Sequence, residues 1–396
     1  MKRLFWALAA ALMMFAPTAL AQTAQEITDT CTLSAVGKKT LGRMTDGQYQ
    51  TYWASSSGSY AYVEIEAEES VGGLYVQFYE DIAALEVQTT DDAGAWRTVA
   101  VSGGSFLNEY IALDAGTETV RIRPKDGKGR LFIAELHVFG EGDVPDWVQQ
   151  WEAPLDKADL LALAAHPDDE LLFLGGTIPY YAGEMGRKVQ VAYLVPTMPY
   201  RRLELLDGLW LCGVKNYPMI GHFPDKYQLT LKGMYAQKGW SRESVYRFVA
   251  ETYRACRPDV VVTQDVNGEY GHGAHRAVAD AAQAAIALAA DENDQEKMTH
   301  SEPWKMTYSE PWQVKKLYLH LYEQNPVKMD WRKPLAAFGG QTAFDLASRA
   351  FECHISQQRT DYHVEDFGPY DNSKFGLAYS AVGEDVQKDD FFENLE

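Results

Sequence analysis

The sequence predicts two domains, an all-β sandwich followed by a three-layer α/β domain with a mostly parallel sheet. The chain has 396 residues, more than the roughly 250 to 300 at which a single hydrophobic core stops growing. Short alternating hydrophobic runs fill residues 30–140, whereas nearly continuous apolar runs separated by helical stretches follow from residue 155. With 46% hydrophobic and 23% charged residues, the chain has enough apolar material for both cores, which excludes a disordered or fibrous protein.

Residues 1–21 have the pattern of a secretory signal peptide. Lys2 and Arg3 precede an apolar run that ends in the small residues a signal peptidase needs. We expect cleavage before Gln22 and a mature protein that is secreted or periplasmic. The later segments are too short or too polar to cross a bilayer, so no membrane span is expected.

The net charge of the chain and the spacing of its cysteines exclude some classes of partner and cofactor. The chain holds 36 Lys and Arg against 56 Asp and Glu, and 36 − 56 gives a formal net charge of −20. Such an acidic surface repels phosphate backbones, so nucleic acid is not expected as a partner. Cys31, Cys212, Cys256 and Cys353 would meet an oxidising compartment after export, but their spacing contains no CxxC and defines no pairing.

The first domain, residues 30–140, is predicted from its strand rhythm. Six short runs alternate between apolar and polar residues, which is typical of an antiparallel sandwich, and they cover residues 60–67, 74–78, 85–89, 110–113, 119–123 and 131–139. Residues 45–53 (TDGQYQTYW) resemble the TDG-xxx-TxW entry loop of discoidin-like (coagulation factor 5/8 C-type) jelly rolls. The resemblance implies a jelly-roll fold with a carbohydrate or other surface ligand. Alternatively, the aromatic residues Tyr49, Tyr52 and Trp53 only pack the sandwich.

Residues 141–154 are acidic, contain two prolines and are predicted as a linker. The domain that follows is predicted over residues 155–385. Four apolar runs, residues 158–165, 189–195, 259–263 and 316–321, alternate with helical stretches there. Strands buried on both faces indicate a parallel sheet in a Rossmann-like α/β fold. Functional sites of such folds lie beyond the carboxyl ends of the strands, so the residues after each run are the candidates.

Two of these positions carry side chains that bind metals. Residues 166–170 (HPDDE) follow the first run, and three acids beside a histidine repel one another unless a cation lies among them. After the third run, His272 and His275 stand one helical turn apart at the start of an alanine-rich helix that we expect to reach about Ala290. Two histidines and one carboxylate form a familiar sphere for catalytic zinc, with a fourth position open to water.

The two motifs resemble those of the PIG-L/LmbE family of zinc-dependent N-deacetylases. They are residues 165–170 (AHPDDE) and residues 271–275 (GHGAH), and the resemblance extends over about residues 159–358. It implies a bound Zn²⁺ and three metal ligands, namely His166, Asp169 and His275. An alternative assignment exchanges His275 for His272.

The same resemblance implies roles for other side chains. Asp168 would be the general base, and His272 would face the developing oxyanion or protonate the departing amine. Arg201, with Glu204, is similar to the family's RxxE helix, whose arginine contacts the substrate. Asp225 is a second candidate for substrate binding.

These observations predict an exported zinc-dependent deacetylase that hydrolyses the N-acetyl amide of an N-acetylglucosamine-type sugar or glycoconjugate. The attached sandwich would hold the catalyst near a polymer or a cell surface. Two alternatives remain: a non-catalytic carbohydrate-binding surface protein, and a zinc amidase that acts on a non-sugar amide. Hydride transfer and serine hydrolysis are disfavoured, because no GxGxxG follows the first α/β strand and the chain contains no GxSxG.

Overall fold

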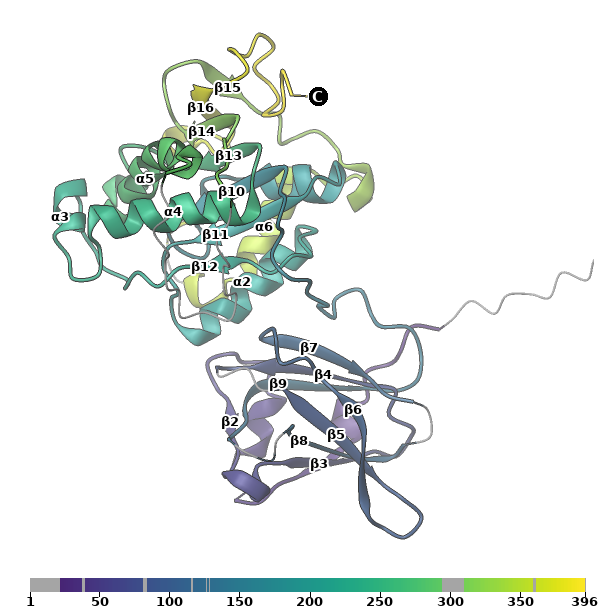
Figure 1. Cartoon of the computed structure of the whole chain (residues 1–396). Coiled ribbons are helices and arrows are strands. Elements are labelled where there is room, and N and C mark those ends of the chain that lie inside the picture. The colour runs from purple at the N-terminus through teal and green to yellow at the C-terminus, as the bar shows by residue number, and fades with distance from the viewer. Residues whose placement is uncertain are drawn as a thin grey trace, which may run out of the picture.

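The computed structural model describes residues 22–395 except 38–39, 81–83, 115–116, 126, 128, 294–309 and 359–360. The predicted signal peptide, residues 1–21, lies outside the described residues. Within the described part of the chain, no helix combines the length and the apolar character needed to cross a membrane. Figure 1 shows a body made of strands and, above it, a second body in which helices surround a sheet.

The N-terminal body consists of two antiparallel sheets that share one core (Figure 1). In sheet order, the five-stranded sheet is β1 (Thr32–Ser34), β3 (Val63–Glu66), β8 (Thr119–Pro124), β5 (Leu85–Thr90) and β6 (Trp96–Val101), and the four-stranded sheet is β2 (Trp53–Ala54), β9 (Phe132–Phe139), β4 (Gly73–Phe78) and β7 (Asn108–Ala112). Apolar and polar residues alternate along strands such as β3, so that one face of the strand packs into the core. Val63 and Ile65 are fully buried, whereas Glu64 and Glu66 are not. The prediction of an all-β region is confirmed.

Strand β6 was not predicted from the sequence. Four of its six residues are exposed and none is buried, so it lacks the buried face from which a strand is recognised in the sequence. It lies at the edge of its sheet and is held by pairing with β5. Backbone hydrogen bonds to a neighbouring strand, rather than a buried face, therefore determine its conformation.

The second body contains a seven-stranded sheet. In sheet order its strands are β12 (Met219–Ile220), β11 (Val189–Tyr193), β10 (Leu160–Ala164), β13 (Val260–Thr263), β14 (Lys316–His320), β16 (Lys374–Ser380) and β15 (Pro326–Lys328). The first five strands are parallel to one another. Strand β16 pairs antiparallel with both β14 and β15. The sequence predicted β10, β11, β13 and β14 but not β16, whose interior Gly376 and half-exposed end weaken the signal of a strand.

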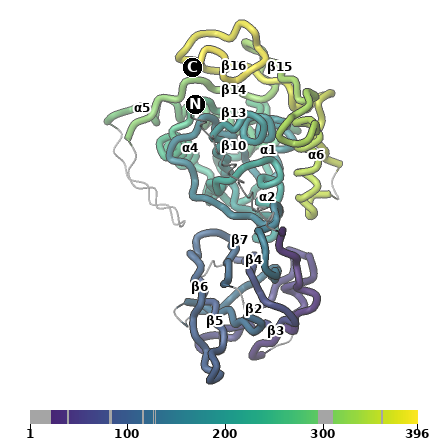
Figure 2. The backbone as a smooth tube through the Cα atoms, turned by 90° about the vertical axis from the view of Figure 1, so that its right-hand side faces the viewer, coloured from purple at the N-terminus to yellow at the C-terminus, as the bar shows by residue number. Residues whose placement is uncertain are grey.

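Helices cover both faces of this sheet (Figure 2). Helices α1 (Asp169–Leu172), α2 (Pro199–Leu211) and α6 (Ala343–Glu352) pack on one face, and α3 (Leu231–Tyr235), α4 (Arg242–Cys256) and α5 (Gly273–Ala290) pack on the other. Successive residues of β10 alternate between the two layers: Ala162 joins the first core, and Leu161 and Leu163 join the second. All five residues of β10 are fully buried, which explains their continuous apolar run.

The order of the strands brings distant segments together. Strand β10 lies between β11 and β13 and is parallel to both. The chain therefore leaves β10 and β13 at the same edge of the sheet, where the order of the strands reverses. Residues after Ala164 and after Thr263 consequently meet, although about 100 positions separate them in the sequence.

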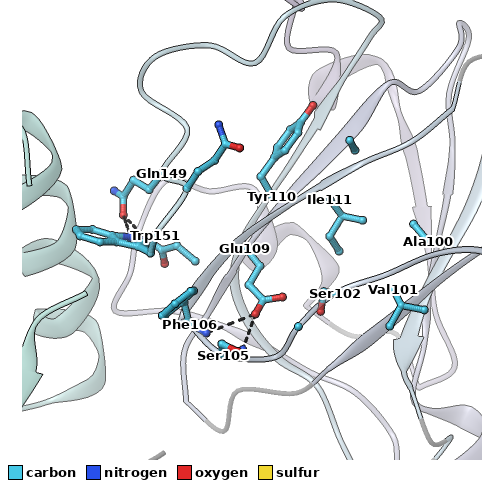
Figure 3. A pocket seen from close by; sticks show the side chains of 14 residues that line it. Ala100, Val101, Ser102, Ser105, Phe106, Glu109, Tyr110, Ile111, Gln149 and Trp151 are labelled. Atoms are coloured by element: carbon cyan, nitrogen blue, oxygen red, sulfur yellow. Dashed lines mark hydrogen bonds between the residues drawn. The ribbon is translucent and has the colours of Figure 1, made fainter. Parts of the chain in front are cut away.

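Part of the predicted linker, residues 141–154, is buried between the two bodies, although most of the segment is exposed. Gln149 is buried, and its Oε1 accepts hydrogen bonds from Asn108 (2.5 Å) and from Trp151 Nε1 (2.9 Å). A hollow of about 370 Å³ lies beside it between β6, β7 and residues 149–151 (Figure 3). Phe106 from the sandwich stacks on Tyr217 of the α/β body with ring centroids 5.1 Å apart. The segment thus fixes one body against the other.

The C-terminal segment extends the second body beyond the predicted boundary at residue 385. Asp385 forms a 2.5 Å ion pair with the fully buried Lys316 of β14, whose amine also donates to the carbonyl of Glu393 (2.8 Å). Phe391 is fully buried and stacks on Tyr181. Residues up to about 395 therefore belong to this body.

One carboxylate at the junction makes stability depend on pH. Asp207 of α2 accepts hydrogen bonds from Tyr49 (2.8 Å) and from Gln149 (2.5 Å). Burial raises the pKa of Asp207 to about 7, although these two hydrogen bonds act in the opposite direction. Between its ordinary pKa and about 7, the folded state holds a proton that the unfolded state has released, so stability falls as pH rises.

We expect Asp207→Asn to remove this dependence, which amounts to at most about 1.4 kcal/mol per pH unit. Urea unfolding at pH 5, 6 and 7 measures it, with Asp92→Asn as a control at an exposed position of the sandwich. Equal slopes of stability against pH in the wild type and in Asp207→Asn would contradict the assignment.

Candidate active site

The turn after β10 folds back on itself and presents His166 and Asp169 together. Asp169 Oδ2 accepts a hydrogen bond from the backbone N–H of His166 (2.8 Å) and lies 3.2 Å from its Nδ1. Between them, Asp168 has φ +108°, a strained region for a residue with a side chain. Its backbone N–H donates to Glu170 Oε2 (2.9 Å), which holds the turn. The two neighbouring carboxylates have different partners: Asp169 contacts His166 and His275, whereas Asp168 contacts Arg201.

The second group of side chains follows β13. His272 precedes the first turn of α5, and His275 lies within that turn. The buried carboxylate of Glu269 lies 2.9 Å from His275 Nδ1 through one oxygen and 2.9 Å from His320 Nδ1 through the other. This contact directs Nε2 of His275 towards the turn after β10, because a carboxylate fixes the tautomer and the orientation of an imidazole.

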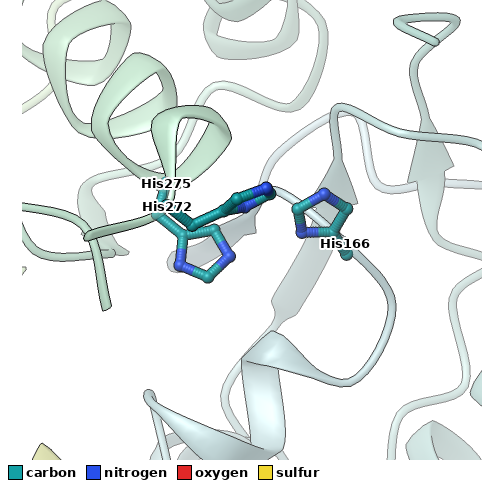
Figure 4. Close-up of side chains that lie close together, drawn as sticks. All are labelled: His166, His272 and His275. Carbon is teal, nitrogen blue, oxygen red and sulfur yellow. The ribbon is translucent and has the colours of Figure 1, made fainter. Parts of the chain in front are cut away.

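The two groups converge on one point (Figure 4). Asp169 Oδ2 lies 3.3 Å from His275 Nε2 and 3.2 Å from His166 Nδ1. One nitrogen from each of His166, His272 and His275 lies within 4.8 Å of the others. Nδ1 of His272 is buried and has no hydrogen-bond partner among the described residues. Imidazole nitrogens with one carboxylate are the donors that zinc prefers, so these side chains fit such an ion.

Mutual charges hold this cluster together. Burial alone would raise the pKa of the Asp169 carboxyl, but His275 and His166 lower it to well below its usual range. Burial disfavours a charged His275, and Asp169 and Glu269 outweigh that effect, so its pKa rises to about 10. For His272, burial and the neighbouring His275 and His166 lower the pKa to about 4. His272 is therefore a neutral imidazole near pH 7.

Asp168 has a different environment. Its Oδ2 accepts a hydrogen bond from Arg201 Nη2 (3.0 Å), and the same nitrogen donates to the carbonyl of Pro167 (2.7 Å). Burial raises the pKa of Asp168 to about 7; Arg201 opposes this shift, and Asp169 and Glu170 add to it. Arg201 was predicted to bind substrate, and in the structure its guanidinium also contacts the candidate base. A carboxylate with a pKa near neutrality suits general base catalysis.

A cavity of about 170 Å³ opens in front of these groups. It is lined by six of the seven residues singled out from the sequence, namely His166, Asp168, Asp169, Arg201, Asp225 and His272. The seventh, His275, is fully buried beside them. Asp225 stands at the mouth with a side chain 58% exposed and its Oδ1 3.8 Å from His166 Nε2. The structure thus brings all seven residues together at one site.

The sequence analysis missed several contributors to this site. Glu269 supports His275, and Tyr270, Gln357 and Tyr362 complete the lining of the cavity. Glu269 and Tyr270 lie within the segment that carries the two histidines, so their position was the only available signal. Nothing in the sequence places Tyr362 at the site, because it comes from a segment that folds back from beyond α6.

Comparison with known proteins confirms the family resemblance of this region. Residues 161–286 match the family model described as PIG-L, GlcNAc-PI de-N-acetylase. A 1D-myo-inositol 2-acetamido-2-deoxy-alpha-D-glucopyranoside deacetylase of Kineococcus radiotolerans is 29% identical over 49% of this chain and 61% of its own length. The protein of that name from Streptomyces avermitilis is 33% identical over 33% of this chain and 54% of its own length. The chain therefore spans about half to three fifths of these curated relatives.

Solved structures give more distant likenesses. The N,N'-diacetylchitobiose deacetylase of Pyrococcus horikoshii is 21% identical and is matched over 54% of this chain and 75% of its own, with a TM-score of 0.36. An F5/8 type C domain from Bacteroides fragilis is 15% identical and is matched over 30% of this chain and 96% of its own, with a TM-score of 0.24. At these TM-scores neither likeness supports a statement about function.

The contact of Glu269 with His275 leads to a prediction about metal affinity. Glu269→Gln keeps the shape of the side chain and removes the charge that orients His275, so we expect zinc to bind about 10- to 100-fold more weakly. Competition with a chromophoric chelator measures this affinity. Glu243→Gln, at the exposed start of α4, is the matched control. Unchanged zinc affinity in Glu269→Gln would exclude the supporting role.

Proposed function

We propose that the chain is a zinc-dependent deacetylase that hydrolyses the N-acetyl amide of an N-acetylglucosamine-type sugar or glycoconjugate. The observation that carries this proposal is the convergence of His166, Asp169 and His275 next to Asp168, a carboxylate that is not needed as a ligand. The match of residues 161–286 to the de-N-acetylase family model supports the same chemistry.

We assign the metal to His166, Asp169 and His275. A zinc ion bound there would polarise an amide carbonyl and lower the pKa of a water molecule. Asp169 lies between the two imidazoles, which favours His275 over His272 as the second histidine ligand. The Glu269 carboxylate behind His275 supports the same choice, because metal-bound histidines commonly donate their other N–H to such a group.

Asp168 accepts the proton of the attacking water. Its carboxylate lines the cavity, and Arg201 holds one of its oxygens in place (3.0 Å). His272 lines the same cavity as a neutral ring, so it is suited to donate one hydrogen bond to the oxyanion that develops on the acetyl carbonyl. Its low pKa makes it a poor reservoir of protons, and the proton held by Asp168 is the one available to the departing amine.

Arg201 and Asp225 are the candidates for contacts with the hydroxyl groups of the sugar. Arg201 lines the cavity and donates a hydrogen bond from Nη2 to Asp168. Asp225 lies at the mouth of the cavity. A guanidinium supplies hydrogen-bond donors and a carboxylate supplies acceptors, and a sugar hydroxyl can pair with either.

For the whole chain we propose an exported enzyme whose N-terminal sandwich is a discoidin-like jelly roll that binds carbohydrate. The signal-peptide pattern of residues 1–21 supports export to a secreted or periplasmic location. We also propose a Rossmann-like classification for the α/β body, supported by its five adjacent parallel strands. A sandwich that binds the glycan would raise the concentration of substrate at the active site.

Acetate release tests the activity. The mature protein is incubated with a panel of N-acetylated saccharides, untreated, after chelation, and after the return of zinc. We expect acetate that disappears with chelator and reappears with zinc. Bound metal without acetate from any saccharide would point to a non-sugar amide, and neither metal nor acetate would favour a non-catalytic carbohydrate-binding protein.

The assignment of the base is tested by Asp168→Asn. This variant keeps a side chain of the same shape but cannot accept the proton, so we expect unchanged zinc content and a kcat lower by about 10² to 10⁴. Zinc content by atomic emission and kcat by acetate release are measured on one preparation, with Asp91→Asn on the sandwich surface as control. Full activity of Asp168→Asn would show that another group is the base.

A further inference from the structure

Four aromatic rings form an arc around one side of the cavity. Tyr227 stacks on His272 with centroids 5.3 Å apart and an interplanar angle of 28°. His272 in turn stacks on Tyr270 at 5.6 Å and 25°, and Tyr270 lies 5.1 Å from Tyr362 at 35°. Three of these rings, His272, Tyr270 and Tyr362, line the cavity, and Tyr227 packs on the first of them.

The outer rings of the arc are unusually open to solvent. Tyr227 is 68% exposed and Tyr362 is 42% exposed. Tyr362 also lines the cavity, and Tyr227 packs on His272 at its edge. Single exposed aromatic rings are common on protein surfaces. Two such rings, each packed on a ring that lines the cavity, form a defined surface at its entrance.

The size of the cavity requires a larger substrate to extend over this surface. Its volume is about 170 Å³, below the roughly 300 Å³ at which pockets for small organic ligands begin. A cavity of this size has no room for two sugar rings, so a ring attached to the one that bears the acetamido group lies outside it. Aromatic rings offer flat apolar faces with polar edges, which suit the C–H faces of a sugar and its hydroxyl groups.

We propose that Tyr227 and Tyr362 form a stacking subsite that holds the sugar ring adjacent to the one being deacetylated, so that the preferred substrate is an oligosaccharide rather than a single sugar. This inference rests on the proposed deacetylase function. It concerns residues that neither of the two sequence motifs contains.

The test compares N-acetylglucosamine with N,N'-diacetylchitobiose and tetra-N-acetylchitotetraose as substrates. We expect kcat/KM of the wild type to rise with chain length. In Tyr227→Ala and Tyr362→Ala, the ratio of the tetrasaccharide value to the monosaccharide value falls about 2- to 10-fold for each ring removed. Tyr227→Phe and Tyr362→Phe keep the stacking face and are expected to keep the ratio. Tyr60→Ala, which removes a 59% exposed tyrosine from the sandwich, is the matched control.

A wild-type ratio near one, or a ratio unaffected by either alanine variant, would overturn the subsite. A binding measurement separates this failure from failure of the proposed function. Isothermal titration of tetra-N-acetylchitotetraose into Asp168→Asn is compared with titration into the same variant lacking both tyrosine rings. Weaker binding without the rings supports the subsite even if no acetate is released from any saccharide. Equal binding, or no binding to either protein, refutes it.

Discussion

The architecture of the site depends on the burial of several carboxylates in one small volume. Asp169 and Glu269 are almost fully buried, and an ionised carboxylate away from water is strongly destabilising unless a cation or hydrogen-bond donors compensate it. Each is compensated twice. Asp169 lies between His166 and His275, and Glu269 lies between His275 and His320. The result is a continuous alternation of acids and bases. A divalent cation bound to these imidazoles would replace the protons that otherwise compensate the carboxylates.

This balance depends on the order of the strands. The acids and histidines come from the ends of β10 and β13, and His320 comes from the end of β14. Because the three strands are adjacent and parallel, these ends lie at one edge of the sheet. Helix α5 then carries His275 into the same region, with its alanine-rich face packed against the sheet. The positive φ of Asp168 is accompanied by a hydrogen bond from its backbone N–H to Glu170, which stabilises the turn.

Helix α2 connects the site with the rest of the molecule. Arg201 contacts Asp168, Glu204 accepts two hydrogen bonds from Ser356, and Asp207 accepts one from Tyr49 of the sandwich. A single helix therefore contacts the candidate base, the turn that follows α6 and the N-terminal body. The sandwich is thus part of the support of the active site as well as a separate body. This arrangement also explains why Gln149 of the predicted linker is buried, since its side-chain amide donates a hydrogen bond to Asp207.

The sequence by itself determined the strongly patterned parts of this protein. Buried strands such as β10 are recognised in the sequence as apolar runs, so the two-body organisation could be predicted. The acids and histidines that follow these runs are typical metal ligands and catalytic groups, so the seven candidate residues could be predicted as well. Tertiary structure decided what depends on neighbours. Strand β6 has no buried face, the partner of Asp207 lies 158 positions away, and Tyr362 reaches the mouth only because the chain folds back. Such contacts cannot be predicted from the local sequence, because they form by pairing and packing between segments that are far apart in the chain.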